Sequence, residues 1–115
     1  MAYEKVGDVQ VAHVQVAQGD LAGALNSYRD SLAIAERLAK SDPGNAGWQR
    51  DLSVAYAKLG STFRLAGEKA KAHDALRQGR SIMEQLTKLS PNNSVWKRDL
   101  ISFDKLIVEL APTDH

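Results

Sequence analysis

An eleven-residue segment occurs twice, and this repeat constrains the fold more than any other feature of the chain. Residues 42–52 read DPGNAGWQRDL and residues 90–100 read SPNNSVWKRDL. Six of the eleven positions are identical, among them Trp48 and Trp96, which lie 48 positions apart. A fixed period over most of a chain is typical of repeat architectures, in which each unit buries its apolar face on its neighbours. The sequence therefore predicts a stack of similar units, a shape that usually binds other molecules and rarely transforms them.

Between the repeated segments, apolar residues recur every three or four positions, which is the pattern of amphipathic helices. Asp20 and Asn45 are expected to cap two of these helices, and Gly67 is expected to end one. Short connections make successive helices antiparallel neighbours. We therefore expect an all-α protein with five helices, at residues 3–18, 20–41, 46–66, 68–89 and 94–110.

The composition bounds the class of protein. A chain of 115 residues is long enough for one domain with a modest core. Its net charge of +1 indicates no general attraction to nucleic acid or membranes, and its lack of cysteine excludes disulfides and thiolate metal sites. No apolar run reaches membrane-spanning length, and the first residues lack the features of a secretory signal. We expect a cytoplasmic protein.

The third and fourth predicted helices carry a motif of aromatic, Leu-Gly and small residues at fixed spacing. The motif residues are Tyr56, Leu59, Gly60, Phe63, Ala72 and Leu76. This motif resembles that of the tetratricopeptide repeat (TPR) family, and the resemblance covers nearly the whole chain. It implies a short α-solenoid of antiparallel helix hairpins, in which Gly60 and Ala72 are small because two helices cross closely there. A bulky residue at Gly60 should therefore overpack the crossing.

The resemblance also implies a domain organisation. The expected units are an N-terminally truncated repeat at about 3–43, a complete repeat at about 44–91, and a capping helix at about 94–110. The period of 48 exceeds the usual 34 residues because the second helix of each hairpin is longer. The chain is similar in this respect to long-helix relatives found in tandem arrays of bacterial multidomain proteins.

TPR domains bind many different partners, so the resemblance implies a non-catalytic protein–protein interaction module without identifying the partner. The alternative is a structural self-assembly element, a fragment of a longer array that oligomerises through its open N-terminal end.

The sequence contains no pattern that predicts catalysis. The three histidines stand in no metal-binding spacing, and no serine lies in a nucleophile elbow. We therefore expect no catalytic, cofactor-binding or metal site. The Arg-Asp pairs at 50–51 and 98–99 are expected to be structural, since an early Asp favours the helix dipole and Arg can reach the adjacent repeat. Trp48 and Trp96 are expected to wedge between successive helices.

Two surfaces are candidates for a protein or peptide partner, which we expect to be acidic or amphipathic. In TPR domains the first helix of each hairpin lines the concave groove, and the resemblance places there Val54, Lys58, Ser61, Arg64 and Leu65. The alternative is a basic patch on the fourth helix, for which a solvated outer face is the plainer interpretation. Its residues are Lys69, Arg77 and Arg80. Nucleic acid would require more charge and interleaved aromatic residues, so we expect none to bind.

The first predicted helix contains a tandem duplication, because residues 9–13 read VQVAH and residues 14–18 read VQVAQ. The duplication allows two registers for this helix. Either residues 6–7 or residues 11–12 occupy the slots that residues 59–60 fill in the next repeat. Five residues rotate a helix by a net angle of about 140°, so both sets cannot face the same neighbour. We expect the register of residues 11–12, because it keeps the period of 48.

That register would leave three apolar residues partly exposed at the open end of the stack. They are Tyr3, Val6 and Val9. An exposed apolar edge favours association with a second copy. The sequence therefore predicts self-association, as a homodimer, through the first two helices.

Overall fold

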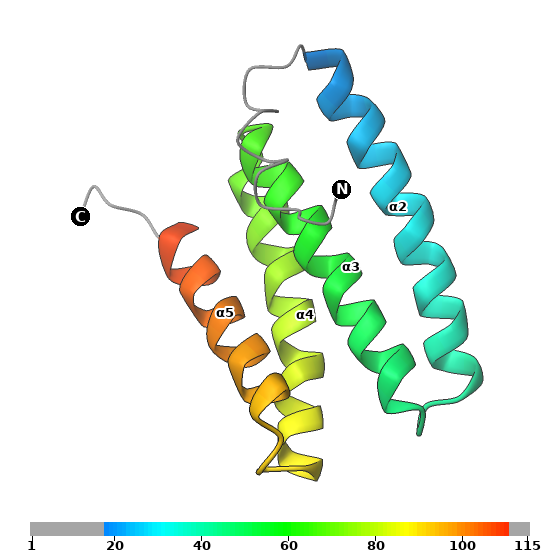
Figure 1. Ribbon diagram of the computed structural model, residues 1–115. Coiled ribbons are helices and arrows are strands. Elements are labelled where there is room, and N and C mark those ends of the chain that lie inside the picture. The colour runs from blue at the N-terminus through cyan, green and yellow to red at the C-terminus, as the bar shows by residue number, and fades with distance from the viewer. Residues whose placement is uncertain (1–17, 111–115) are drawn as a thin grey trace.

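The computed structural model describes residues 18–110, and this part of the chain consists of four helices. They are α2 (Gln18–Ser41), α3 (Ala46–Leu65), α4 (Lys69–Leu89) and α5 (Ser94–Leu110). Each helix runs antiparallel to the one before it and lies beside it, and α3 and α4 occupy the middle of the arrangement (Figure 1). The prediction of an all-α fold is confirmed for these residues. The first of the five predicted helices lies outside the described residues.

The two repeated segments form the same helix start. Asn45 accepts a hydrogen bond on Oδ1 from the backbone N–H of Trp48, at 3.0 Å, at the beginning of α3. Asn93 accepts the equivalent bond from the N–H of Trp96, also at 3.0 Å, at the beginning of α5. Each bond satisfies a backbone donor that has no partner inside the helix. The predicted cap at Asn45 is confirmed, and the repeat in sequence is a repeat in structure.

The predicted cap at Asp20 is wrong. Asp20 lies within α2 (Gln18–Ser41) and therefore does not cap it. The apolar pattern did not reveal this, because neither Gln18 nor Gly19 carries an apolar side chain.

Gly67 ends α3, as predicted. Its backbone has a φ of +81°, a conformation that side chains with a Cβ rarely adopt. The N–H of Glu68 donates to the carbonyl of Phe63 at 2.9 Å, and the N–H of Gly67 donates to that of Arg64 at 3.0 Å. These two bonds form a Schellman motif, which turns the chain into α4 within a few residues.

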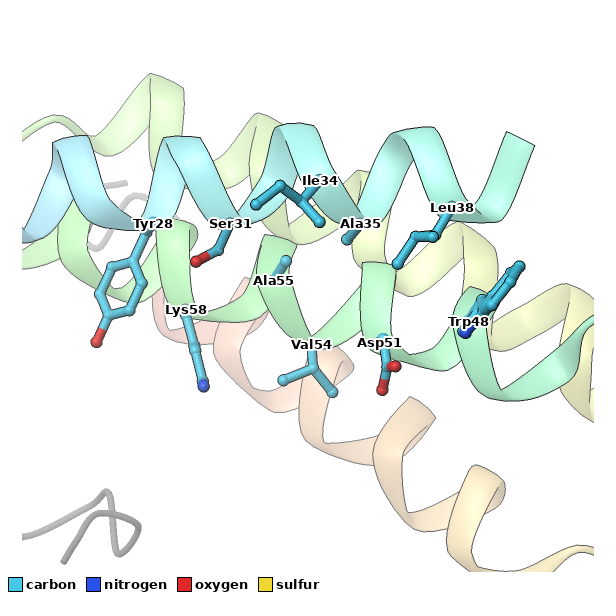
Figure 2. Close-up of a pocket in the computed structure, with 10 residues that line it drawn as sticks. All are labelled: Tyr28, Ser31, Ile34, Ala35, Leu38, Trp48, Asp51, Val54, Ala55 and Lys58. Carbon is cyan, nitrogen blue, oxygen red and sulfur yellow. The ribbon is translucent and has the colours of Figure 1, made fainter. Parts of the chain in front are cut away.

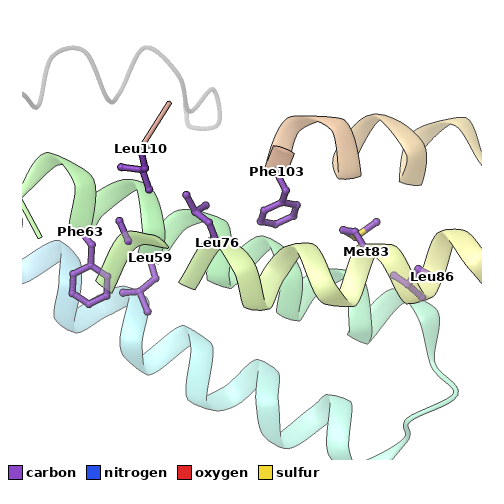
Figure 3. Close-up of a cluster of buried hydrophobic side chains, with 8 residues drawn as sticks. Leu59, Phe63, Leu76, Met83, Leu86, Phe103 and Leu110 are labelled. Carbon is purple, nitrogen blue, oxygen red and sulfur yellow. The ribbon is translucent and has the colours of Figure 1, made fainter. Parts of the chain in front are cut away.

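The hydrophobic core lies where α4 meets α3 and α5 (Figure 3). Helix α4 contributes a buried stripe at alternating steps of three and four residues, which is the spacing of one helix face. Side chains of both α3 and α5 pack against this stripe. The core residues are Leu59, Phe63, Ala72, Leu76, Met83, Leu86, Phe103 and Leu110.

Two buried glycines allow the helices to approach closely. A Cβ atom on Gly60 of α3 would lie 2.8 Å from Cγ of Leu76, which confirms that this position must be small at the α3–α4 crossing. A Cβ atom on Gly79 of α4 would lie 2.5 Å from the ring of Phe103 and 3.1 Å from the carbonyl oxygen of Ser53. Gly79 thus provides the space for an aromatic ring from α5.

We predict that Gly79→Ala destabilises the fold by about 1–3 kcal/mol, because the new methyl group overpacks against the buried ring of Phe103. Gly23→Ala is the matched control, since nothing lies within 4 Å of the new Cβ. There the same change should stabilise the fold by about 0.5–1 kcal/mol through helix propensity alone. Urea denaturation measures both free energies of unfolding. Stabilisation by both substitutions would contradict the close packing at Gly79.

Candidate functional site

A groove runs along the surface between α2 and α3 (Figure 2). Helix α2 contributes residues at positions 28, 31, 35 and 38, and α3 contributes residues at positions 48, 51, 55 and 58. Steps of three and four residues place each set on one face of its helix. The periodicity of both helices therefore builds the two walls of the groove. The lining residues are Tyr28, Ser31, Ile34, Ala35, Leu38, Trp48, Asp51, Val54, Ala55 and Lys58.

Large apolar side chains remain accessible in this groove. Ile34 is 50% exposed and Leu38 is 39% exposed. Single exposed apolar residues are ordinary on protein surfaces. These two line one groove together with Tyr28 and Val54, so most of the groove lining is apolar. A surface of this kind is typical of a site that binds another apolar surface.

The next repeat contains the same groove, and there it is filled. Moving the lining of α2 forward by 48 positions gives residues on α4, and moving the lining of α3 forward gives residues on α5. Five of the ten counterparts are buried, four are half-buried, and Ser102, the counterpart of Val54, is exposed. Six of the matched positions, each with its counterpart, are Tyr28 and Leu76, Ser31 and Gly79, Ala35 and Met83, Leu38 and Leu86, Asp51 and Asp99, and Ala55 and Phe103.

Helix α3 is the element that fills the second groove. Ser53 donates from Oγ to Sδ of Met83 at 3.2 Å, and its carbonyl oxygen lies close to Gly79. Gly60, two turns further along α3, packs against Leu76. A helix therefore occupies the site on α4 and α5 that corresponds to the groove on α2 and α3.

An ion pair holds α3 in the second groove. Arg50 donates from Nε to Oδ2 of Asp99 at 2.7 Å, and this hydrogen bond raises the pKa of Arg50 above its usual value. The prediction that an Arg of one repeated segment reaches the adjacent repeat is confirmed. Asp51 and Arg98 are the counterparts of the two paired residues. Both are exposed, and neither forms an ion pair within residues 18–110.

The predicted partner-binding residues of α3 separate into two groups. Val54 and Lys58 line the groove with α2. Ser61, Arg64 and Leu65 do not line it. Arg64 instead lies beside α5, where its Nη1 is 3.6 Å from Oε1 of Glu109. The groove residues that sequence reasoning missed belong to α2. Their signal was available, since they align with the apolar stripe of α4 at the period of 48.

The alternative basic patch loses one of its three cations. Arg80 donates from Nε to Oδ1 of Asp104 on α5, and its Nη1 lies 3.4 Å from Oε1 of Glu84. Arg80 therefore joins two helices. Lys69 and Arg77 are exposed on α4. The partner of Arg80 was missed because Asp104 is distant in sequence and reaches Arg80 only through the packing of α5 on α4.

The remaining predicted residues are placed as follows. Trp48 is half-buried in the wall of the groove, and Trp96 packs against the hydrophobic core. Tyr3, Val6 and Val9, together with the two registers of the first helix, lie outside the described residues.

A tyrosine fixes the spacing of the two groove walls. Tyr56 of α3 donates from its hydroxyl to Oε2 of Glu36 on α2, at 3.0 Å. Burial, together with this hydrogen bond, raises the pKa of Tyr56 to about 12. The neutral phenol is therefore the form that the fold stabilises.

Within residues 18–110, no group of three or more histidine or acidic side chains gathers into a candidate metal site, and none of the helices is long and apolar enough to cross a membrane. Comparison of the chain with protein-family models, with curated proteins and with solved structures finds no match.

We predict that the Arg50–Asp99 pair contributes a coupling energy of about 0.5–1 kcal/mol in a double-mutant cycle with alanine, because both side chains are only partly exposed. The matched control is the cycle for Asp51 and Arg98, measured in dilute solution, where the coupling should be zero. Urea denaturation measures both cycles. Equal coupling energies in the two cycles would contradict the assignment of a specific ion pair to Arg50 and Asp99.

Tyr56→Phe should destabilise the fold by about 1 kcal/mol at neutral pH, because Glu36 loses its donor. The raised pKa of Tyr56 means that its contribution is complete below the usual value of 10 and is lost as the pH rises towards 12. The difference in unfolding free energy between the two proteins should therefore shrink between pH 9 and pH 11.5. A difference that stays constant over this range would contradict the assignment.

Proposed function

We propose that this protein is a non-catalytic protein–protein interaction module that binds an amphipathic helix in the groove between α2 and α3. One observation carries the proposal: α3 occupies the equivalent site on α4 and α5. A site that accepts a helix in one repeat is built again, from corresponding positions, in the preceding repeat. Binding an apolar helix face in an apolar groove is a recurrent mode of protein recognition.

The contacts of α3 specify what the bound helix should present. Helix α3 runs antiparallel to α4, and its N-terminal end carries the Arg50 that pairs with Asp99. The bound helix should therefore run antiparallel to α2 and place a basic residue near Asp51. Lys58 lies further along the same wall and would favour an acidic residue in the second half of the helix.

The resemblance to TPR domains supports the same class of function, because members of that family bind proteins and peptides. The basic patch is less favoured as a binding site, since Arg80 already pairs with Asp104 and Glu84. An acidic partner would find only Lys69 and Arg77 exposed there.

A synthetic peptide of residues 46–65 tests the proposal, because this segment is the helix that fills the equivalent site. A fluorescent label on the peptide allows its binding to the full chain to be measured by anisotropy. A free helix of this length is only marginally stable in water, so the titration must extend to high micromolar protein. We expect saturable binding that Ile34→Glu weakens at least about tenfold.

Leu89→Glu is the matched control, because Leu89 is an exposed apolar residue outside the groove. This variant should bind the peptide as tightly as the unaltered chain. No saturable binding, or equal weakening by both substitutions, would contradict the proposed function.

A further inference from the structure

Helix α5 presents a row of exposed side chains along one face. Ile101 is 56% exposed, Val108 is 70% exposed, and Arg98 is exposed one turn before Ile101. Their spacings of three and seven residues place them on the same side of the helix. Two large apolar residues and a cation are therefore available in line on the last helix that the structure describes.

This row is the counterpart of the α3 face that docks on the next repeat. Moving back by 48 positions takes Arg98 to Arg50, Ile101 to Ser53 and Val108 to Gly60. Those three residues of α3 contact Asp99, Met83 and Leu76. Helix α5 thus carries the docking face of an internal repeat helix.

We propose that α5 of one copy of this chain docks in the α2–α3 groove of a second copy. This inference rests on the proposed function and names the groove's occupant. Arg98 pairs with Asp51 of the second copy, and Ile101 packs against Ala35 of the second copy. The copies then continue the repeat stack from one molecule to the next.

At the Ile101 position the side-chain sizes of this contact are complementary, whereas at the Val108 position, whose counterpart Gly60 packs against Leu76, the docked helix must lie further from Tyr28. Within the chain, the small Ser53 contacts the large Met83. Between copies the sizes are exchanged, because Ile101 replaces Ser53 and Ala35 replaces Met83. Ala35 is shorter than Met83, so the groove can accept a side chain longer than Ser53, such as that of Ile101.

The two sites also differ in aromatic residues at the same level. In the filled site, the ring of Phe103 packs beside Gly79, close to Ser53. The counterpart of Phe103 in the open groove is Ala55, which lacks the ring. The open groove thus lacks, at this level, the internal aromatic residue that the next repeat has.

The charges at this contact are also complementary. The Arg50–Asp99 pair shows that this position in the stack accommodates an Arg on the docked helix and an Asp on the groove. Arg98 and Asp51 provide the same two groups on separate copies. At the period of 48, the residues that precede Arg50 and Ser53 in the sequence are Ala2 and Lys5, so the sequence does not repeat the Arg at that position.

The contact joins two different surfaces, so each copy uses its groove for one neighbour and its α5 for another. Such a heterologous contact produces open head-to-tail chains unless the rotation between copies closes a ring. Association should therefore continue beyond the dimer as the concentration rises.

Sedimentation velocity of the full chain over a range of concentrations tests the inference. We expect the weight-average sedimentation coefficient to rise steadily with concentration. Asp51→Arg and Arg98→Asp should each weaken association at least about tenfold, because each places like charges at the contact. An equimolar mixture of the two variants should associate as the unaltered chain does, since each contact in an alternating chain again joins opposite charges. Leu89→Glu should leave association unchanged.

Recovery in the mixture would establish the contact, because two merely destabilised variants do not restore each other. Association that neither charge reversal nor Ile101→Glu reduces would overturn the inference. A chain that stays monomeric but binds the peptide of residues 46–65 would also overturn it, while leaving the helix-binding groove in place. A monomeric chain that does not bind the peptide would overturn both proposals, as expected if the groove is filled from within the same molecule.

Discussion

The close approach of α3 to α4 is the constraint on which the rest of the structure depends. Gly60 brings α3 onto Leu76, and Gly79 opens α4 to the ring of Phe103, so that three helices share one core. The Arg50–Asp99 pair then fixes the start of α3 against α5. Because packed interiors tolerate little change in volume, these contacts determine both the spacing of the helices and their register.

The same construction explains why a groove exists. The site that α3 occupies on α4 and α5 is built again one repeat earlier, on α2 and α3. There, Ala35 and Ala55 stand at the positions of Met83 and Phe103. The groove on α2 and α3 retains exposed apolar side chains. On α5, Ile101 stands where α3 has the smaller Ser53. The proposed contact between copies uses both of these differences.

Periodicity and local motifs predicted most of the fold. The bounds of the four described helices, to within two residues, the cap at Asn45 and the end at Gly67 follow from residues close in sequence, and the structure reproduces them. Contacts between helices were less accessible. The Arg80–Asp104 pair depends on how α5 packs on α4, and charge counts along one helix do not contain that information. The α2 wall of the groove was not predicted, because the family resemblance places only the first helix of each hairpin, here α3, in the binding groove.

Thiol cross-linking tests the central claim most directly, since the chain contains no cysteine of its own. Ile101→Cys and Ala35→Cys place single thiols on the docking face of α5 and on the groove. If α5 of one copy takes the position that α3 takes within the chain, a short thiol-specific cross-linker should join the two variants into a dimer when they are mixed, and should join either variant alone far less. Equal cross-linking in all three samples, or none above that of a Leu89→Cys control, would contradict the claim.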